Sequence, residues 1–193
     1  MSQLGAADRA CLLAMARRAI DDELAGDAGD GPPLDDLPAR LVQPGACFVT
    51  LKLGGALRGC VGSIEPRRPL AVDVAKNARA AAFSDTRFAR MTAEELARAR
   101  ITIAILGRLV PMPSATREDF ERALRPGVDG AVLAEHGRRA TFLPAVWAGI
   151  ASPREFVDHL LRKLGVDVRH WSAEMAAWSY EVESFGDDLD ETP

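Results

Sequence analysis

The chain has 193 residues and a formal net charge of -4, from 24 basic and 28 acidic side chains. This length suits one domain or two small lobes that share a core, and the charge balance gives no indication of a nucleic acid or an anionic membrane as a partner. The three cysteines are too few for a disulfide framework and odd in number, so they indicate free thiols in the cytoplasm. No apolar run approaches the roughly 20 residues that cross a bilayer.

The spacing of apolar residues predicts the elements. Helices are expected where these residues recur every three or four positions, and strands where they alternate with polar ones. The helices predicted in this way cover residues 6–24, 70–83, a short stretch after Thr92, 117–124 and 152–164. The predicted strands cover residues 47–53, 56–62, 101–106, 128–135, 139–143 and 178–185. Residues 25–45 are rich in Gly, Pro and Asp and predict a loop.

Local motifs predict where several elements begin. Gly54-Gly55 is typical of a two-residue hairpin turn. Pro69 suits the first position of a helix, and Thr92-Ala93-Glu94-Glu95 is a capping-box pattern. Ser152-Pro153-Arg154-Glu155 combines a capping serine with a first-position proline. Because the strands come as hairpins with helices between them, we expect an α+β fold with a mainly antiparallel sheet and flanking helices.

One stretch is unusual in composition. Leu57-Arg58-Gly59-Cys60-Val61-Gly62, called the signature stretch below, lies on the second strand of the predicted hairpin. It resembles the Leu-Arg-Gly-Cys-Ile-Gly signature of the AMMECR family, whose bacterial and archaeal branch is called AmmeMemoRadiSam system protein A. Ser84-Asp85-Thr86-Arg87-Phe88 resembles the Asp-Pro-Arg-Phe segment of that family, although Thr86 replaces the usual proline. Residues 138–147 resemble its Gly-Thr-Phe-Leu-Pro-Gln-Val segment, and residues 156–165 a helix in which a second cysteine is common.

The resemblance covers about residues 12–185. It implies a single AMMECR-type domain over residues 1–186, with two lobes and a cleft between them. The acidic residues 187–193 are expected to form a disordered tail. The family resemblance also implies two protein partners, a Memo-like dioxygenase-type protein and a radical-SAM protein. It does not specify a reaction or a cofactor.

Cys60 is the candidate catalytic nucleophile. A reactive thiol needs a lowered pKa, and Arg58, two residues away, is the cation that could supply it. Free cysteines are also among the most buried residues, so the structural interpretation of a buried, slow thiol is favoured. In a two-residue turn Arg58 faces Leu51 on the more apolar side of the hairpin. We therefore expect Arg58 to point inward and to pair with the carboxylate of Asp85.

The other candidate binding residues each allow two interpretations. Gly59 and Gly62 either let a ligand or another backbone come close, or form a bend in the hairpin. Asp85 and Arg87 either line a cleft or pair with each other, and pairing is favoured. Arg138 and Thr141 are further candidates, because they lie in the segment 138–147 that resembles the family. The three histidines and three cysteines show no zinc-site spacing, and no phosphate-binding loop is present, so neither a metal nor a cofactor is expected.

Two classes of function follow. In the first, the protein is an adaptor or accessory component that docks on partner proteins. In the second, it is a cleft enzyme that uses Cys60 and Arg58 on a small anionic or carbonyl substrate. The adaptor is preferred, because no proton-transfer group accompanies Cys60 in the sequence. Whether the chain is an enzyme stays open at this point.

Overall fold

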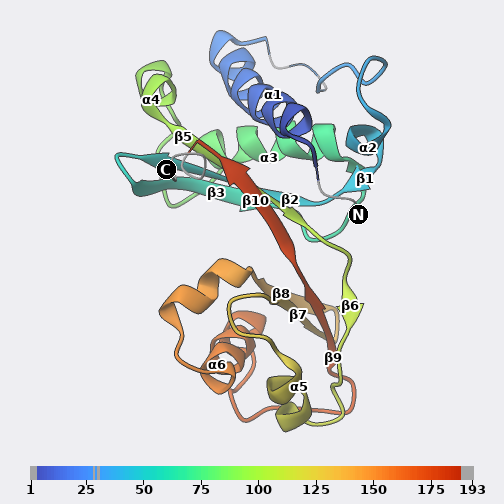
Figure 1. Cartoon of the computed structure of the whole chain (residues 1–193). Helices are drawn as coiled ribbons and strands as arrows, with labels where there is room; N and C mark the ends of the chain where they lie inside the picture. The colour runs from blue at the N-terminus through green and yellow to red at the C-terminus, as the bar shows by residue number, and fades with distance from the viewer. Residues whose placement is uncertain (1–3, 28, 30, 188–193) are drawn as a thin grey trace. The chain divides into compact units, whose positions relative to one another are not determined.

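The computed structural model describes residues 4–27, 29 and 31–187. They form two compact units. The inner unit is residues 107–182, and the split unit is formed by the described residues before residue 107 together with residues 183–187. Figure 1 gives the helices and strands of both. Among the described residues, no helix combines the length and the apolar character that spanning a membrane requires.

The split unit is a four-stranded sheet covered by helices. Its strands have the order β10-β5-β2-β3, and β2 pairs antiparallel with both β3 and β5. The helices α1 and α3 pack over one face of this sheet (Figure 1). The elements are α1 (Ala6–Ala25), α2 (Ala39–Val42), β1 (Pro44–Gly45), β2 (Cys47–Leu53), β3 (Ala56–Gly62), β4 (Arg68–Pro69), α3 (Leu70–Phe83), α4 (Ala93–Arg98), β5 (Arg100–Leu106) and β10 (Val182–Gly186).

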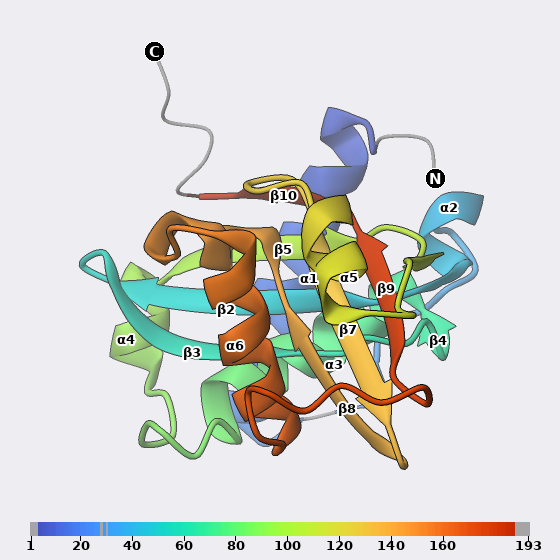
Figure 2. The same ribbon diagram turned by 90° about the horizontal axis from the view of Figure 1, so that it is seen from below.

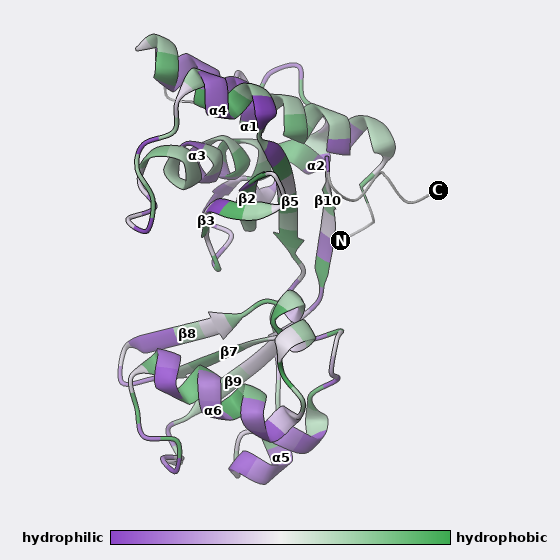
Figure 3. Cartoon of the chain, turned by 90° about the vertical axis from the view of Figure 1, so that its left-hand side faces the viewer, coloured by the Kyte–Doolittle hydropathy of each residue, from purple (hydrophilic) through white to green (hydrophobic). Residues whose placement is uncertain are grey.

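The inner unit is a second antiparallel sheet with the strand order β6-β9-β7-β8. Helices α5 and α6 lie against it (Figure 2). Its elements are β6 (Val110–Pro111), α5 (Arg117–Ala123), β7 (Gly130–Glu135), β8 (Arg138–Phe142), a 3-10 helix (Pro144–Gly149), α6 (Pro153–Leu164) and β9 (Ala176–Tyr180). The helix α6 has a hydrophilic and a hydrophobic side (Figure 3), and the hydrophobic side contributes Phe156, Leu160 and Leu164 to the core.

Each unit has its own core, and the sequence periodicity explains both. In β2 the alternate residues Cys47, Val49 and Leu51 are fully buried. Along α3 the residues Leu70, Val74, Ala78 and Ala81 form the buried stripe. A fully buried Val or Leu side chain stabilises the fold by roughly 1.5–3 kcal/mol through the hydrophobic effect. In the inner unit the rings of Trp147 and Phe156 stack with their centroids 4.1 Å apart.

The expected α+β class with antiparallel pairing is confirmed. The bounds of β2, β3 and α3 agree with the sequence prediction, and Gly54 and Gly55 have φ angles of 56° and 82°, as their turn requires. Ser152 caps α6 as expected, since its hydroxyl accepts a hydrogen bond from the N–H of Glu155 at 3.2 Å. The Thr92 capping box is also present.

Four sequence predictions are corrected. Residues 25–45 are not all loop, because they contain α2 and the short strand β1. Pro69 precedes α3 instead of beginning it. Residues 178–185 are not one strand, because Glu181 separates β9 from β10 and these two strands belong to different sheets. Asp187, predicted to begin a disordered tail, pairs with Arg17 at 3.1 Å and accepts the N–H of Ile101 at 2.9 Å; residues 188–193 lie outside the described residues.

Candidate functional site

The signature stretch forms β3, at the edge of the sheet of the split unit, and a bulge shifts its register. Next to the turn, Lys52 faces Leu57 as predicted. Beyond it Leu51 faces Gly59, which leaves Arg58 as the extra residue of a β-bulge. Cys60 therefore faces Thr50 and not Val49, so the register predicted from the turn is wrong beyond the bulge.

Close packing requires glycine at both glycine positions of the stretch, Gly59 and Gly62. A Cβ on Gly59 would lie 2.1 Å from the carbonyl oxygen of Ala81 in α3. A Cβ on Gly62 would lie 2.3 Å from the ring of Phe48 and 2.6 Å from the carbonyl oxygen of Cys47. Both positions exclude any side chain. Of the two interpretations drawn from the sequence, the close approach of another backbone describes Gly59.

Arg58 is buried, and its partner is Glu95 at the start of α4. Its Nε and Nη2 donate to the two carboxylate oxygens of Glu95 at 3.0 and 2.9 Å, and Nη2 also donates to the carbonyl of Ala89 at 2.9 Å. Hydrogen bonds from Arg58 and from the N–H of Thr92 lower the pKa of Glu95. The predicted Arg58–Asp85 pair is therefore wrong, because Glu95 supplies the carboxylate.

Asp85 and Arg87 pair with each other and close the edge of β3. Arg87 donates to the two oxygens of Asp85 at 2.9 and 2.7 Å. The same carboxylate accepts the backbone N–H of Cys60 at 2.9 Å, while Arg87 reaches the carbonyl of Cys60 at 3.5 Å. The hydrogen bond from Arg87, followed by the N–H of Cys60, holds the pKa of Asp85 well below its usual range. The ion pair thus satisfies backbone groups that an edge strand would otherwise expose.

Cys60 is half-buried, so the expectation of a mostly buried thiol is corrected. Its Sγ accepts a hydrogen bond from the hydroxyl of Thr50 at 3.4 Å. The nearby cation is Arg87 and not Arg58: the pKa of Arg87 is raised first by its hydrogen bond to Asp85 and to a lesser degree by the charge of Cys60. Asp85 is a poor general base, because its pKa is low. The site therefore has a thiol and a cation without a matched base.

A second polar cluster, which was not predicted, lies between α3 and the start of β2. The buried carboxylate of Asp73 accepts the N–H of Cys47 at 3.0 Å, the amide of Asn77 at 2.9 Å and the hydroxyl of Ser63. Burial, followed by the charge of Asp73, raises the pKa of the Cys47 thiol. The sequence signal was two polar residues, Asp73 and Asn77, four positions apart beside the apolar stripe of α3. This cluster ties the start of β2 to α3.

Arg138 and Thr141 have partners inside the inner unit. Arg138 donates to the carbonyl of Gly165 at 3.0 Å and so caps the C-terminal end of α6. Thr141 donates to the carbonyl of Ala131 at 2.8 Å and lies 2.7 Å from the hydroxyl of Tyr180. Over the described residues, no group of three or more His, Cys, Asp and Glu side chains is arranged to hold a metal ion.

These features define a class: an α+β protein of two antiparallel sheets, with a glycine-packed signature strand whose edge is closed by an Asp–Arg pair. The family model AMMECR1 matches residues 13–185, and the chain belongs to the AMMECR1 family. A protein of Methanothermobacter thermautotrophicus is 32% identical over 181 residues, which cover 92% of this chain and 93% of that protein. A protein of Aeropyrum pernix is 35% identical over 161 residues, which cover 81% of this chain and 64% of that protein.

A solved structure is similar over the same length. The crystal structure of the uncharacterized protein PH0010 from Pyrococcus horikoshii has a TM-score of 0.83 and 26% sequence identity. The match covers 95% of this chain and 93% of that chain. The similarity therefore extends over both units of the fold.

Proposed function

We propose that this protein is a cytoplasmic accessory component that acts by binding partner proteins and not by covalent catalysis at Cys60. The observation that supports this most directly is how the signature stretch is used. Arg58 is paired with Glu95, Asp85 with Arg87, and Gly59 is closed against α3. Side chains that are paired in this way hold the fold together. Few of their polar groups are left to bind a substrate.

The partners that we propose are a Memo-like dioxygenase-type protein and a radical-SAM protein. They rest on the family resemblance of the signature stretch and of the Ser84–Phe88 segment. Aromatic and arginine side chains, which are common in protein interfaces, lie beside the signature strand. Arg87 is 56% exposed and lies 5.5 Å from the centroid of the Phe88 ring.

The test is direct binding between purified proteins. This chain and each of the two proposed partners from the same organism are mixed, and binding is measured by calorimetry and by size-exclusion chromatography. We expect a complex with at least one partner, and we expect Cys60→Ser to bind as tightly as the unchanged chain. Absence of any complex with both partners contradicts the proposal. A Cys60→Ser variant that binds normally but abolishes the activity of the assembly contradicts the non-catalytic role.

One observation supports a cleft enzyme as the second candidate. Cys60 is half-buried, and a guanidinium, that of Arg87, lies beside it. Such a thiol could attack a small anionic or carbonyl substrate held by the cation. Iodoacetamide labelling of the native protein at neutral pH separates the two candidates, with Cys60→Ser as the control that identifies the labelled position. Labelling of Cys60 faster than free cysteine favours the enzyme, and slower labelling favours the accessory role.

A further inference from the structure

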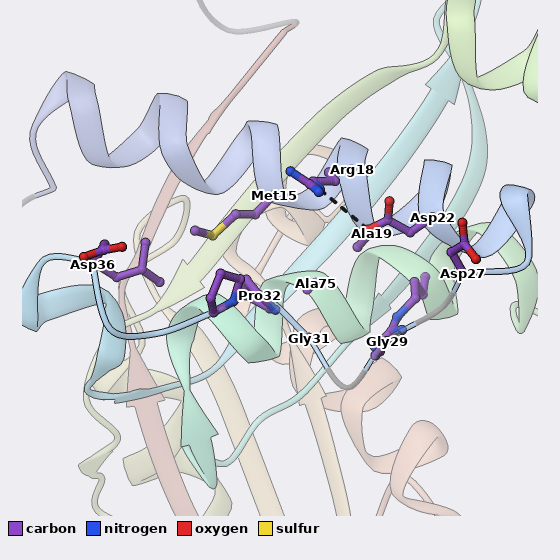
Figure 4. A pocket seen from close by; sticks show the side chains of 13 residues that line it. Met15, Arg18, Ala19, Asp22, Asp27, Gly29, Gly31, Pro32, Asp36 and Ala75 are labelled. Carbon is purple, nitrogen blue, oxygen red and sulfur yellow. Dashed lines mark hydrogen bonds and ion pairs between the residues drawn. The ribbon is translucent and has the colours of Figure 1, made fainter.

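The split unit contains a pocket that the signature strand does not line. A pocket of about 390 Å³ lies between α1, α3 and the loop that follows α1 (Figure 4). Its volume falls within the range of roughly 300–1,000 Å³ that is usual for small-molecule sites. Neither the proposed function nor the signature stretch uses this pocket.

The floor of the pocket is apolar. Ala19 on α1 and Ala75 on α3 are small, so the two helices leave space between them and the loop. Met15, from α1, and Pro32 and Leu37, from the loop, complete the apolar lining. An apolar molecule would replace water on these surfaces with a favourable free energy.

The charges around the pocket are not balanced. Arg18 pairs with Asp22 at 3.7 Å. Arg79 donates to the carbonyl of Gly29 at 2.7 Å. Two further carboxylates, those of Asp27 and Asp36, line the pocket and form no side-chain hydrogen bond or ion pair with any described residue. Two uncompensated carboxylates against one uncompensated guanidinium leave the pocket with a surplus of negative charge.

The position of Asp36 indicates where the positive group of a ligand would lie. Figure 4 shows Asp36 at one end of the pocket and Asp27 toward the other, with the side chains of Met15 and Pro32 between them. Arg18 pairs with Asp22, away from Asp36 (Figure 4), and Arg79 donates to the carbonyl of Gly29, two residues from Asp27. A ligand with a positive group at the Asp36 end and an apolar body along the floor therefore matches the pocket.

We propose that this pocket binds a small organic cation with an apolar body, in which an ammonium group lies against Asp36. The probe is n-hexylammonium chloride, and sodium hexanoate of the same chain length is the matched comparison. Binding to the full chain is measured from the shifts of backbone and methyl NMR signals. We expect hexylammonium to shift signals of Ala19 and Ala75 and to bind about fivefold more tightly than hexanoate.

Three variants make the test specific. Asp36→Asn is expected to weaken hexylammonium binding about threefold to fivefold, whereas hexanoate binding does not weaken. Asp35→Asn is the matched control, because Asp35 is an exposed neighbour in the same loop that does not line the pocket. Ala19→Met keeps a good helix former and fills the floor, so it is expected to abolish binding.

The proposal is overturned by any of three results. Hexanoate that binds as tightly as hexylammonium would show that the charge of the pocket plays no part. An equal effect of Asp35→Asn and Asp36→Asn would show that only the overall charge matters. Unchanged binding in Ala19→Met, with its fold verified by circular dichroism, would place the ligand elsewhere.

Discussion

The carboxylate of Asp85 lies 2.9 Å from the backbone nitrogen of Cys60, and Arg87 holds it there with two hydrogen bonds. In a sheet interior this N–H would bond to a neighbouring strand. Here a side-chain pair takes the place of that strand, and the edge of the sheet ends at β3. The Asp85–Arg87 pair therefore supports the signature strand, and its contribution to the free energy of unfolding can be measured.

The stabilisation by Asp85 is expected to depend on pH. Because the folded-state pKa of Asp85 is lowered, its contribution is fully present above the unfolded pKa of about 3.9 and is lost as the pH falls toward the folded value. Asp85→Asn should lower the free energy of unfolding by about 2 kcal/mol near neutral pH. Urea unfolding of both proteins near pH 7 and near pH 3 measures this. A difference that does not shrink in acid would contradict the role of the charge.

Arg58 and Glu95 are expected to be energetically coupled. A double-mutant cycle with Arg58→Met and Glu95→Gln should give a coupling of about 2 kcal/mol, because the pair is bidentate and largely buried. Glutamine at position 95 still accepts the N–H of Thr92, so the cap of α4 is kept. The control cycle pairs Arg58→Met with Asp85→Asn, for which we expect no coupling. Equal coupling in both cycles would restore the partner predicted from sequence.

Gly59→Ala should be strongly destabilising. The added methyl group would overlap the carbonyl oxygen of Ala81, which is backbone and cannot rotate away, so we expect a loss of about 3 kcal/mol. Gly149→Ala is the control, because its Cβ would meet no atom within 4 Å. Thermal unfolding of both variants tests the prediction. Similar stabilities would mean that β3 and α3 can separate at little cost.

Tyr180 is the only tyrosine of the chain, so its titration can be followed by ultraviolet absorbance. Burial raises the pKa of Tyr180 to about 12, although the hydrogen bond with Thr141 opposes the shift. Because the folded-state pKa is raised, the free energy of unfolding should fall by about 2–3 kcal/mol as the pH rises from about 10 to about 12. Circular dichroism over the same range shows whether the fold persists. Half-titration near pH 10 with the fold intact would contradict the burial.

The sequence predicted the elements well where one local pattern decides the structure. The alternation in residues 47–53 and the helical stripe of residues 70–83 gave the observed bounds. The bulge at Arg58 was not predictable from the turn, because its position depends on the contact of Gly59 with α3. The break at Glu181 has no glycine or proline to mark it, and the alternation continues through it.

The sequence indicated several residues of the site, but it did not indicate all of the contacts between them. The mutual pairing of Asp85 and Arg87 was anticipated, since they lie two residues apart. Glu95 was interpreted only as a capping residue, and nothing in the sequence shows that one carboxylate serves both Thr92 and Arg58. Such a shared partner depends on a contact across 37 positions of the chain.

The pairing of Gly107 with Glu181 has a consequence for the connection between β5 and β10. The N–H of Gly107 donates to the carbonyl of Glu181 at 2.8 Å, so the chain leaves β5 and returns on β10 at the same point. The inner unit thus occupies the place of a hairpin turn and can be described as a graft. A chain in which Asn-Gly replaces residues 107–181 should retain the split unit, as judged by its NMR spectrum. The shortened chain would keep the signature strand, because β10, β5, β2 and β3 form one sheet without any strand of the inner unit.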